Sequence, residues 1–116
     1  MQEELYKTDQ VIYTTLGIYP RTFRPPYGSV NPLVLEKSGM PAILWSIDPY
    51  DWKTHNIKKN IAAVHNAKDG DILIMHDIHE ASVASIPAII QTLKEKGFTF
   101  VTISELLSLT EANAQI

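Results

Sequence analysis

Apolar residues along this chain follow two different spacings, which together predict helices alternating with short strands. Apolar positions three or four residues apart, the period of one helix face, predict helices that begin near residues 2, 31, 56, 78 and 102. Short apolar runs lie between them and end in polar or proline-containing loops, which is typical of buried strands. Strands are predicted at residues 22–24, 42–47, 71–75 and 98–101.

Capping residues support the expected ends of these helices. Asn31, followed by Pro32, and Asn56 further along the chain are suited to the N-cap position, where a side-chain oxygen accepts a free backbone N–H. Thr102 with Glu105 three residues later forms a capping-box pattern, which predicts the start of the last helix. Glycines that can end helices are Gly17, Gly39 and Gly97.

The same spacing predicts which residues face the core. In the longest apolar helical pattern, Pro87 should either kink the helix or mark a late start. The residues assigned to core faces are Leu5, Val11, Ile12 and Leu16 in the first helix, Ile57, Ile61 and Val64 in the third, and Val83, Ile86, Ile90 and Leu93 in the fourth.

The alternation of helices and strands predicts an α/β fold with a parallel sheet. Four strand–helix units correspond to half of an eight-stranded barrel, although a small open sheet would also satisfy the pattern. A stand-alone receiver-like α/β domain is a further alternative. Such a domain would begin with a strand, whereas this chain begins with a predicted helix.

Composition narrows the function classes. The 116 residues suffice for one domain, and an apolar fraction of 45% fits a packed core. A net charge of −3 and the lack of a basic stripe give no support to nucleic-acid binding. The apolar runs are far too short to span a membrane. With no cysteine in the sequence, disulfides, thiol nucleophiles and cysteine–zinc sites are excluded.

Three successive predicted strands are followed by unusual polar sequences. These are Arg24-Pro25-Pro26-Tyr27-Gly28, Asp48-Pro49-Tyr50-Asp51-Trp52 and His76-Asp77-Ile78-His79. Because parallel strands all end on the same edge of a sheet, where ligands bind, we expect the three loops to converge. Two acids beside an indole ring form a polar site with a flat apolar wall, which suits a sugar ring.

Each loop also has a simpler interpretation. Arg24 could merely pair with a carboxylate, and the acids of residues 48–52 could cap the next helix with Trp52 packed beneath it. His76 could be a core histidine with satisfied hydrogen bonds. The spacing of His76 and His79 could suggest a metal site, but the pair straddles a strand end and a loop, where this spacing does not guarantee a shared face. Only the combination of three loops favours a functional site.

In this order, the three loops resemble the motifs of the polysaccharide deacetylase family, the NodB-homology domain of carbohydrate esterase family four. Residues 24–28 match an Arg-x-Pro-Tyr-Gly type motif, and residues 48–52 match an Asp-x-x-Asp-Trp motif. Residues 74–76 match a Leu-x-His motif, with Ile74 in place of leucine. The resemblance continues through residues 99–107 and is greatest to peptidoglycan N-acetylglucosamine deacetylases of Gram-positive bacteria.

The resemblance implies that residues 1–109 are the C-terminal half of a distorted (β/α) barrel of the NodB-homology type, with a flexible tail at residues 110–116. The first half of the family's domain carries a Thr-Phe-Asp-Asp-Gly-Pro motif and a spaced histidine pair. These supply the catalytic base and the ligands of a divalent metal, usually zinc. Neither motif occurs in this sequence, so the metal ligands are expected to lie outside it. The other half of the domain, or self-association, is expected to cover the open sheet edges.

The implied reaction is metal-dependent hydrolysis of N-acetyl groups on a cell-wall or related polysaccharide. His76 is the implied general acid, and Asp51 is expected to hydrogen-bond its imidazole and favour the charged form. Arg24 is implied to pair with the catalytic base of the other half, and the Tyr27 backbone N–H to hold the oxyanion. Asp48 is expected either to support this arrangement or only to cap its loop, and the same holds for Asp77. Residues implied to contact the substrate are Trp52, Ile74, Pro25, Pro26 and Tyr50.

A chain with the acid but without the base or the metal ligands is expected to be inactive alone. The alternative is an inactive fragment or a sugar-binding or regulatory module without turnover, which would use Trp52 and Tyr50 as stacking platforms. The family's substrates imply an extracellular or cell-surface location.

Overall fold

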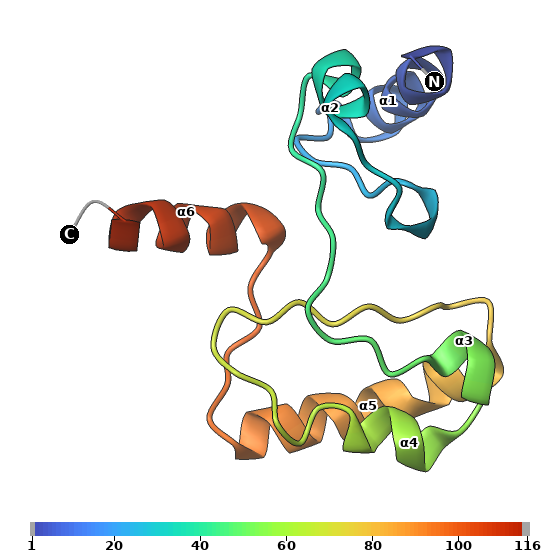
Figure 1. Ribbon diagram of the computed structural model, residues 1–116, viewed down its shortest axis with the longest axis vertical. Helices are drawn as coiled ribbons and strands as arrows, with labels where there is room; N and C mark the ends of the chain where they lie inside the picture. The colour runs from blue at the N-terminus through green and yellow to red at the C-terminus, as the bar shows by residue number, and fades with distance from the viewer. Residues whose placement is uncertain (1, 115–116) are drawn as a thin grey trace. The chain divides into compact units, whose positions relative to one another are not determined.

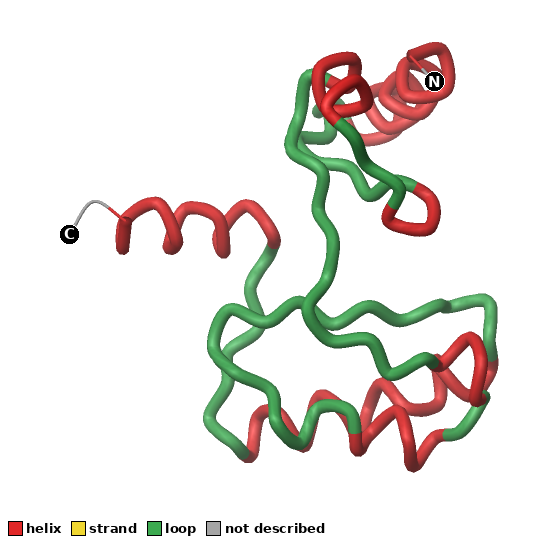
Figure 2. The backbone as a smooth tube through the Cα atoms, viewed as in Figure 1, coloured by secondary structure: helices red, strands yellow, loops and turns green. Residues whose placement is uncertain are grey.

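The computed structural model describes residues 2–114, and its regular secondary structure is helical (Figures 1 and 2). The chain divides into two compact units, Met1–Leu44 and Trp45–Ile116, each of which is described by itself. Among the described residues, no helix is long and apolar enough to cross a membrane. The helical elements are α1 (Gln2–Leu16), the 3-10 turn η1 (Pro26–Gly28), α2 (Pro32–Ser38), α3 (Asp51–Thr54), α4 (Ile57–Ala62), α5 (Glu80–Glu95) and α6 (Ile103–Ala114).

In the first unit, the predicted helix ends are confirmed. α1 ends before Gly17, which has a φ of 77° and whose N–H donates to the Tyr13 carbonyl at 2.7 Å. The Asn31 side chain caps α2 by accepting the Val34 N–H at 2.9 Å. Gly39 follows α2 with a φ of 66°, in the left-handed region that glycine adopts without strain. These ends are specified by a few neighbouring residues.

The predicted core face of α1 is wrong for two of its four residues. Val11 and Leu16 are each 66% exposed, whereas Leu5 and Ile12 are partly buried. Within its unit, α1 packs against α2, which has seven residues against the fifteen of α1. A helix of that length cannot cover the whole apolar face of its neighbour, so part of this face stays exposed.

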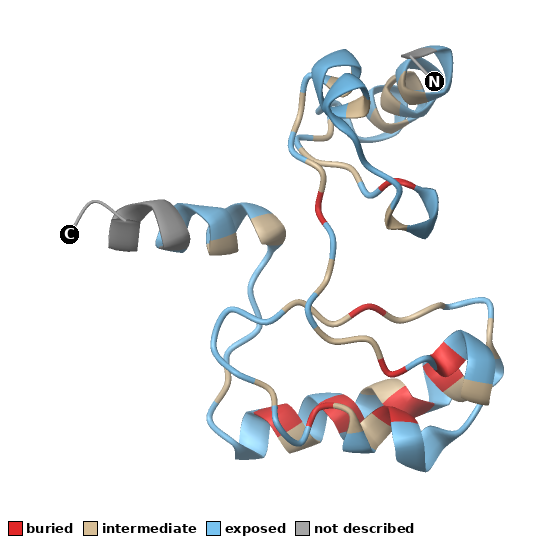
Figure 3. Ribbon diagram, viewed as in Figure 1, coloured by how far each residue is buried: buried red, intermediate tan, exposed pale blue. Residues whose placement is uncertain are grey.

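The core of the second unit forms where α4 and α5 pack together (Figure 3). The Asn56 side chain caps α4 as predicted, accepting the Lys59 N–H at 3.0 Å. Val64, just after α4, is fully buried against Ile89 and Leu93 of α5. Partly buried residues packed against this cluster are Ile61, Ala67, Leu73, Met75 and Phe98. Ile57, which was assigned to the core, is 43% exposed.

The buried face of α5 differs from the predicted one. Val83 is 53% exposed and Ile90 is 37% exposed, although both were assigned to the core with Ile86 and Leu93. Leu93 is buried as predicted and Ile86 is partly buried. The residues actually buried along α5 are Ser82, Ser85, Ile89 and Leu93. A rule that buries the most apolar face fails here because the serines have polar partners inside the unit.

Pro87 does not delay the start of α5. The helix begins at Glu80 and continues through Pro87 to Glu95, so the late start, one of the two alternatives, is wrong, and the kink stays a prediction. Gly97 follows the helix with a φ of 90°, as its position in the sequence predicted.

The predicted strands are irregular segments, and isolated parallel bridges join parts of the first three. One bridge pairs Phe23 with Ala42 in the first unit, and the other pairs Ile47 with Leu73 in the second. The parallel direction agrees with the prediction, but no continuous strand is present in residues 2–114 (Figure 2), so the four-stranded half-barrel is not confirmed. Parallel ladders normally require cover on both faces. In these segments, Leu44 is 40% exposed and Phe100 is 50% exposed.

The capping box at the start of α6 is confirmed. The Glu105 N–H donates to Thr102 Oγ1 at 3.2 Å, and the Thr102 N–H donates to Glu105 Oε1 at 3.2 Å. α6 extends to Ala114, past the start of the tail predicted at residues 110–116. The flexibility of that tail stays a prediction, and residues 115–116 lie outside the described part of the chain.

Candidate active site

Asp51 begins α3, and a tight turn in front of it sets its position. Asp48 accepts the Tyr50 N–H at 2.8 Å, a local bond typical of aspartate in turns. Asp48 therefore acts as a loop cap, one of the two interpretations left open by the sequence. Tyr50 itself has a φ of 55°, which turns the chain into α3. The Asp51 side chain that follows is fully buried.

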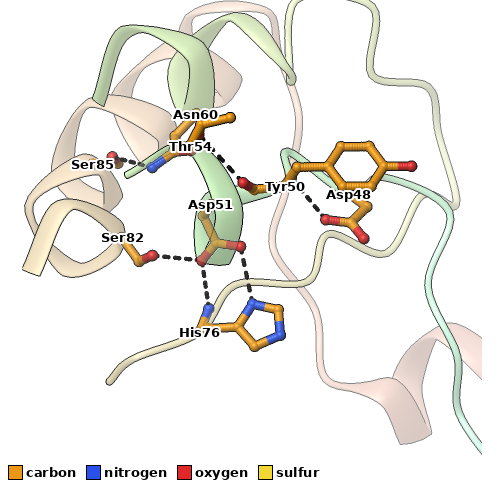
Figure 4. A network of polar contacts seen from close by, with 8 residues as sticks. All are labelled: Asp48, Tyr50, Asp51, Thr54, Asn60, His76, Ser82 and Ser85. Carbon is orange, nitrogen blue, oxygen red and sulfur yellow. Dashed lines mark hydrogen bonds and ion pairs between the residues drawn. The ribbon is translucent and has the colours of Figure 1, made fainter. Parts of the chain in front are cut away.

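Three hydrogen bonds hold the Asp51 carboxylate (Figure 4). Its Oδ2 accepts the His76 backbone N–H at 2.7 Å and the Ser82 hydroxyl at 2.5 Å. Its Oδ1 lies 2.9 Å from His76 Nδ1. The structure thus brings Asp51 and His76 together, as the loop pattern predicted, and it adds Ser82 from α5.

The Asp51 contact determines how the His76 imidazole is arranged. An ionised carboxylate only accepts hydrogen bonds, so the proton in this contact belongs to Nδ1 of the imidazole. The other nitrogen, Nε2, is then the one left to exchange a proton with a ligand. The His76 side chain is 36% exposed, whereas that of Asp51 is 0% exposed. A buried anion that holds one side of a partly exposed imidazole is a suitable arrangement for a general acid or base.

Burial and hydrogen bonding shift the pKa of the Asp51 carboxyl in opposite directions. Burial alone raises this pKa, because it disfavours the charged form. The Ser82 hydroxyl, the His76 N–H and the His76 imidazole all stabilise the anion, and together they hold the pKa of Asp51 below its usual value. The carboxylate is therefore ionised at neutral pH, as its contact with His76 requires.

The lowered pKa of Asp51 predicts a loss of stability in acid. Because this pKa is lower in the folded than in the unfolded chain, the stabilisation is present at neutral pH and is lost as the pH falls below about 4, through the folded-state pKa. Urea unfolding at a series of pH values should show a weaker acid dependence in Asp51→Asn than in the parent chain. The pKa of Asp71 is also lowered, mainly by the Lys68 N–H. Asp71 is present in both proteins, so its contribution to the acid dependence is the same in each. Equal acid dependence would contradict the prediction.

A second buried polar pair joins α4 to α5 beside this network (Figure 4). Asn60 Nδ2 donates to Ser85 Oγ at 3.0 Å, and Ser85 Oγ donates to the Ala81 carbonyl at 2.6 Å. Neither Ser82 nor Ser85 is among the residues predicted to have a role in the site. The signal was available, because two serines three residues apart occupy one face of an otherwise apolar helix.

The site residues predicted within segment 24–28 belong to the first unit. Arg24 Nε donates to the Ile43 carbonyl at 3.1 Å. Pro25 is buried, and its carbonyl accepts the Gly28 N–H at 3.0 Å, closing the turn that contains η1. Tyr27 has a φ of 58° and a fully exposed side chain. The convergence of this loop on His76 stays a prediction, as do the roles given to Arg24 and Tyr27.

The aromatic residues beside Asp51 are exposed. Tyr50 is 55% exposed and Trp52 is 46% exposed. Their ring centroids lie 6.4 Å apart with an angle of 56° between the planes. This geometry leaves apolar ring surface available for a sugar. Ile74, by contrast, is 8% exposed, so little of its surface can contact a ligand within this unit. The assignment of these residues to substrate stays a prediction.

The described residues do not form a metal site. Within residues 2–114, no group of three or more histidine, aspartate or glutamate side chains is placed to hold a metal ion. The His79 ring packs edge-to-face on the ring of His55, with centroids 4.6 Å apart.

Several known proteins that resemble this chain are named as peptidoglycan deacetylases. The chain is 43% identical over 106 residues to the peptidoglycan-N-acetylglucosamine deacetylase PgdA of Listeria monocytogenes, covering 89% of this chain and 22% of that protein. The structure of the peptidoglycan deacetylase PdaC from Bacillus subtilis matches with a TM-score of 0.91 and 32% identity, over 97% of this chain and 56% of that chain. No protein-family model matches the chain.

These similarities place the chain with the NodB-homology polysaccharide deacetylases of carbohydrate esterase family four, of which it matches a C-terminal part. The family assignment made from the three loop motifs is thereby confirmed. The chain spans 22% of the length of the first curated relatives and 56% of the first solved chain, so the activity of those whole proteins applies to it only as a proposal.

One further solved structure shows that membership of this family does not by itself imply enzymatic activity. A pseudoenzyme of the same family from Bacillus anthracis matches with a TM-score of 0.83 and 29% identity, over 91% of this chain and 39% of that chain. Membership of the family therefore does not guarantee turnover, and the side chains of each member have to be considered.

Proposed function

We propose that this chain contributes the leaving-group acid and the sugar-binding aromatic residues of a polysaccharide N-deacetylase. The observation that carries the proposal is the buried Asp51 carboxylate held against Nδ1 of the partly exposed His76. Similarity to peptidoglycan deacetylases supports it, because 97% of the chain matches the structure of one of them with a TM-score of 0.91. Metal-dependent deacetylation requires ligands and a base from another polypeptide segment.

The proposed role of His76 follows from the chemistry of amide hydrolysis. After water adds to the acetyl carbonyl, the carbon–nitrogen bond breaks and the departing amine needs a proton. Nε2 of a doubly protonated His76 donates that proton, and the bond from Nδ1 to Asp51 keeps the ring oriented. The imidazole returns to its neutral state and is recharged from solvent through its exposed side.

The remaining predicted residues have supporting roles in this proposal. The Tyr27 N–H, presented by a tight turn, stabilises the oxyanion, and Arg24 pairs with the base supplied from outside the chain. Trp52 and Tyr50, whose rings are partly exposed, stack on sugar rings of the polymer. The proposed substrate is a cell-wall polysaccharide, and the work is done outside the cell or at its surface.

The first test measures turnover with and without the missing catalytic groups. The 116-residue chain with added zinc is expected to release no acetate from an N-acetylglucosamine oligomer, because it carries neither base nor metal ligands. A mixture with the N-terminal part of the deacetylase domain of PgdA should release acetate. The matched control is the same mixture made with His76→Ala. Turnover by the isolated chain, or a fully folded complex without turnover, would contradict the proposal.

A non-catalytic sugar-binding function is the second candidate. It is favoured by the exposure of Trp52 and Tyr50 and by the existence of a pseudoenzyme in the family. In that case the chain would bind the oligomer saturably, Trp52→Ala would abolish the binding, and the folded mixture would still release no acetate.

A further inference from the structure

Ser82 donates the shortest of the hydrogen bonds that the Asp51 carboxylate accepts. Its side chain is buried on α5, with 1% of the residue exposed, and its Oγ lies 2.5 Å from Asp51 Oδ2. A hydroxyl bonded to a carboxylate at this distance is a charge-assisted hydrogen bond, which is stronger than a neutral one. The single hydroxyl proton of Ser82 is therefore committed to Asp51.

We propose that Ser82 is a positioning residue that orients His76 through Asp51, an inference that rests on the proposed acid role of His76. The carboxylate group of an aspartate rotates in a broad torsional minimum, so one anchor does not fix its two oxygens. With Oδ2 held by both the Ser82 hydroxyl and the His76 N–H, Oδ1 is left facing His76 Nδ1. Ser82 thus helps to keep Oδ1 facing Nδ1 and so supports the tautomer that the Asp51 contact selects, although it does not touch His76 side-chain atoms in the bonds described.

Ser85 provides a matched comparison for a purely structural role. It lies one turn further along the same buried face of α5 and is also fully buried. Its hydroxyl is bonded to Asn60 and to the Ala81 carbonyl rather than to Asp51. Loss of either hydroxyl removes a buried hydrogen bond and should lower stability, by more at Ser82 because its acceptor is charged. Only loss of the Ser82 hydroxyl should alter the imidazole.

Other polar groups near His76 are the same in every variant. Asp77 follows His76 directly and is exposed, and the His79 N–H donates to the His76 carbonyl at 3.2 Å. The His79 carbonyl accepts the Ser82 backbone N–H at 3.1 Å, a bond that every substitution of Ser82 keeps. Because neither Asp77 nor His79 is bonded to the Ser82 hydroxyl in the contacts described, a change in the His76 ring on substitution of Ser82 reports on the route through Asp51.

The test is nitrogen NMR of the His76 imidazole in the full 116-residue chain at a pH where the ring is neutral. The parent chain should show one tautomer, with a slowly exchanging proton on Nδ1. In Ser82→Ala this proton signal should be lost and the two tautomers should be mixed. Ser82→Cys, which keeps the volume but donates weakly, should show the same change and guards against misfolding of the alanine variant. Ser82→Thr, which keeps a hydroxyl, should restore the parent spectrum.

Ser85→Ala is the control and should leave the His76 signals as in the parent chain. A parent-like spectrum in both Ser82→Ala and Ser82→Cys would overturn the inference, and so would an equal change in Ser85→Ala. The measurement needs no turnover, so its failure is distinct from that of the proposed function. Absence of acetate release would refute the deacetylase role and leave the effect of Ser82 on His76 intact.

Discussion

Replacing Asp51 by alanine is expected to lower the free energy of unfolding of the second unit by about 2–4 kcal/mol. The substitution leaves a buried hydroxyl on Ser82 and a backbone N–H on His76 without their acceptor, and each such group costs roughly 1–3 kcal/mol. Urea unfolding followed by the fluorescence of Trp45 and Trp52, which both lie in this unit, measures the change.

Asp48→Ala is the matched control for this loss of stability. Asp48 belongs to the same loop and accepts one backbone N–H, that of Tyr50 in an exposed turn, where water can replace the lost acceptor. We expect a change of about 0.5–1 kcal/mol. Equal effects of the two substitutions would show that the buried network contributes no more than an ordinary turn.

Replacing His76 by alanine is expected to lower kcat by about 10²- to 10⁴-fold in the mixture that contains the base and the metal ligands. The physical reason is that an amine is a poor leaving group unless it is protonated as the carbon–nitrogen bond breaks. Acetate release from an N-acetylglucosamine oligomer, compared between parent and variant, measures the effect. His79→Ala is the control, because His79 contacts His55 through its ring and has no proposed role in the reaction.

A second substrate, whose leaving group needs no proton, can distinguish this acid role from a general loss of structure. An acetyl ester with a nitrophenolate leaving group needs no proton to depart, so His76→Ala should reduce its hydrolysis far less than that of the amide. A collapse of both activities by the same factor would contradict the acid role and indicate that His76 only supports the fold.

The local features of this protein could be predicted because a few adjacent residues specify them. Asn31, Asn56 and the pair of Thr102 and Glu105 each supply a side-chain oxygen within one helical turn of the N–H that needs it. The contact of Asp51 with His76 was also predictable, but through the order of the loop motifs rather than through physics alone.

Burial could not be predicted from amphipathic spacing, because it depends on which surfaces meet. On α5, spacing favoured Val83 and Ile90 for the core, yet Ser82 and Ser85 are buried there. The apolar strand segments likewise predicted a sheet, whereas the described residues form isolated parallel bridges with apolar side chains partly exposed. A sheet is stable only when its faces are covered, which is a property of the partners and not of the strand sequence.

The sequence by itself determined the helix ends, the family and the identity of the acid–histidine pair, because each is carried by residues close together or by ordered motifs. Only the tertiary structure decided that the Asp51 carboxylate is buried and that Ser82 holds its second oxygen. The reason is that Ser82 is 31 residues from Asp51, so their hydrogen bond exists only after α5 has packed onto the unit. Packing thereby buries the Asp51 carboxylate and holds it in one orientation beside His76.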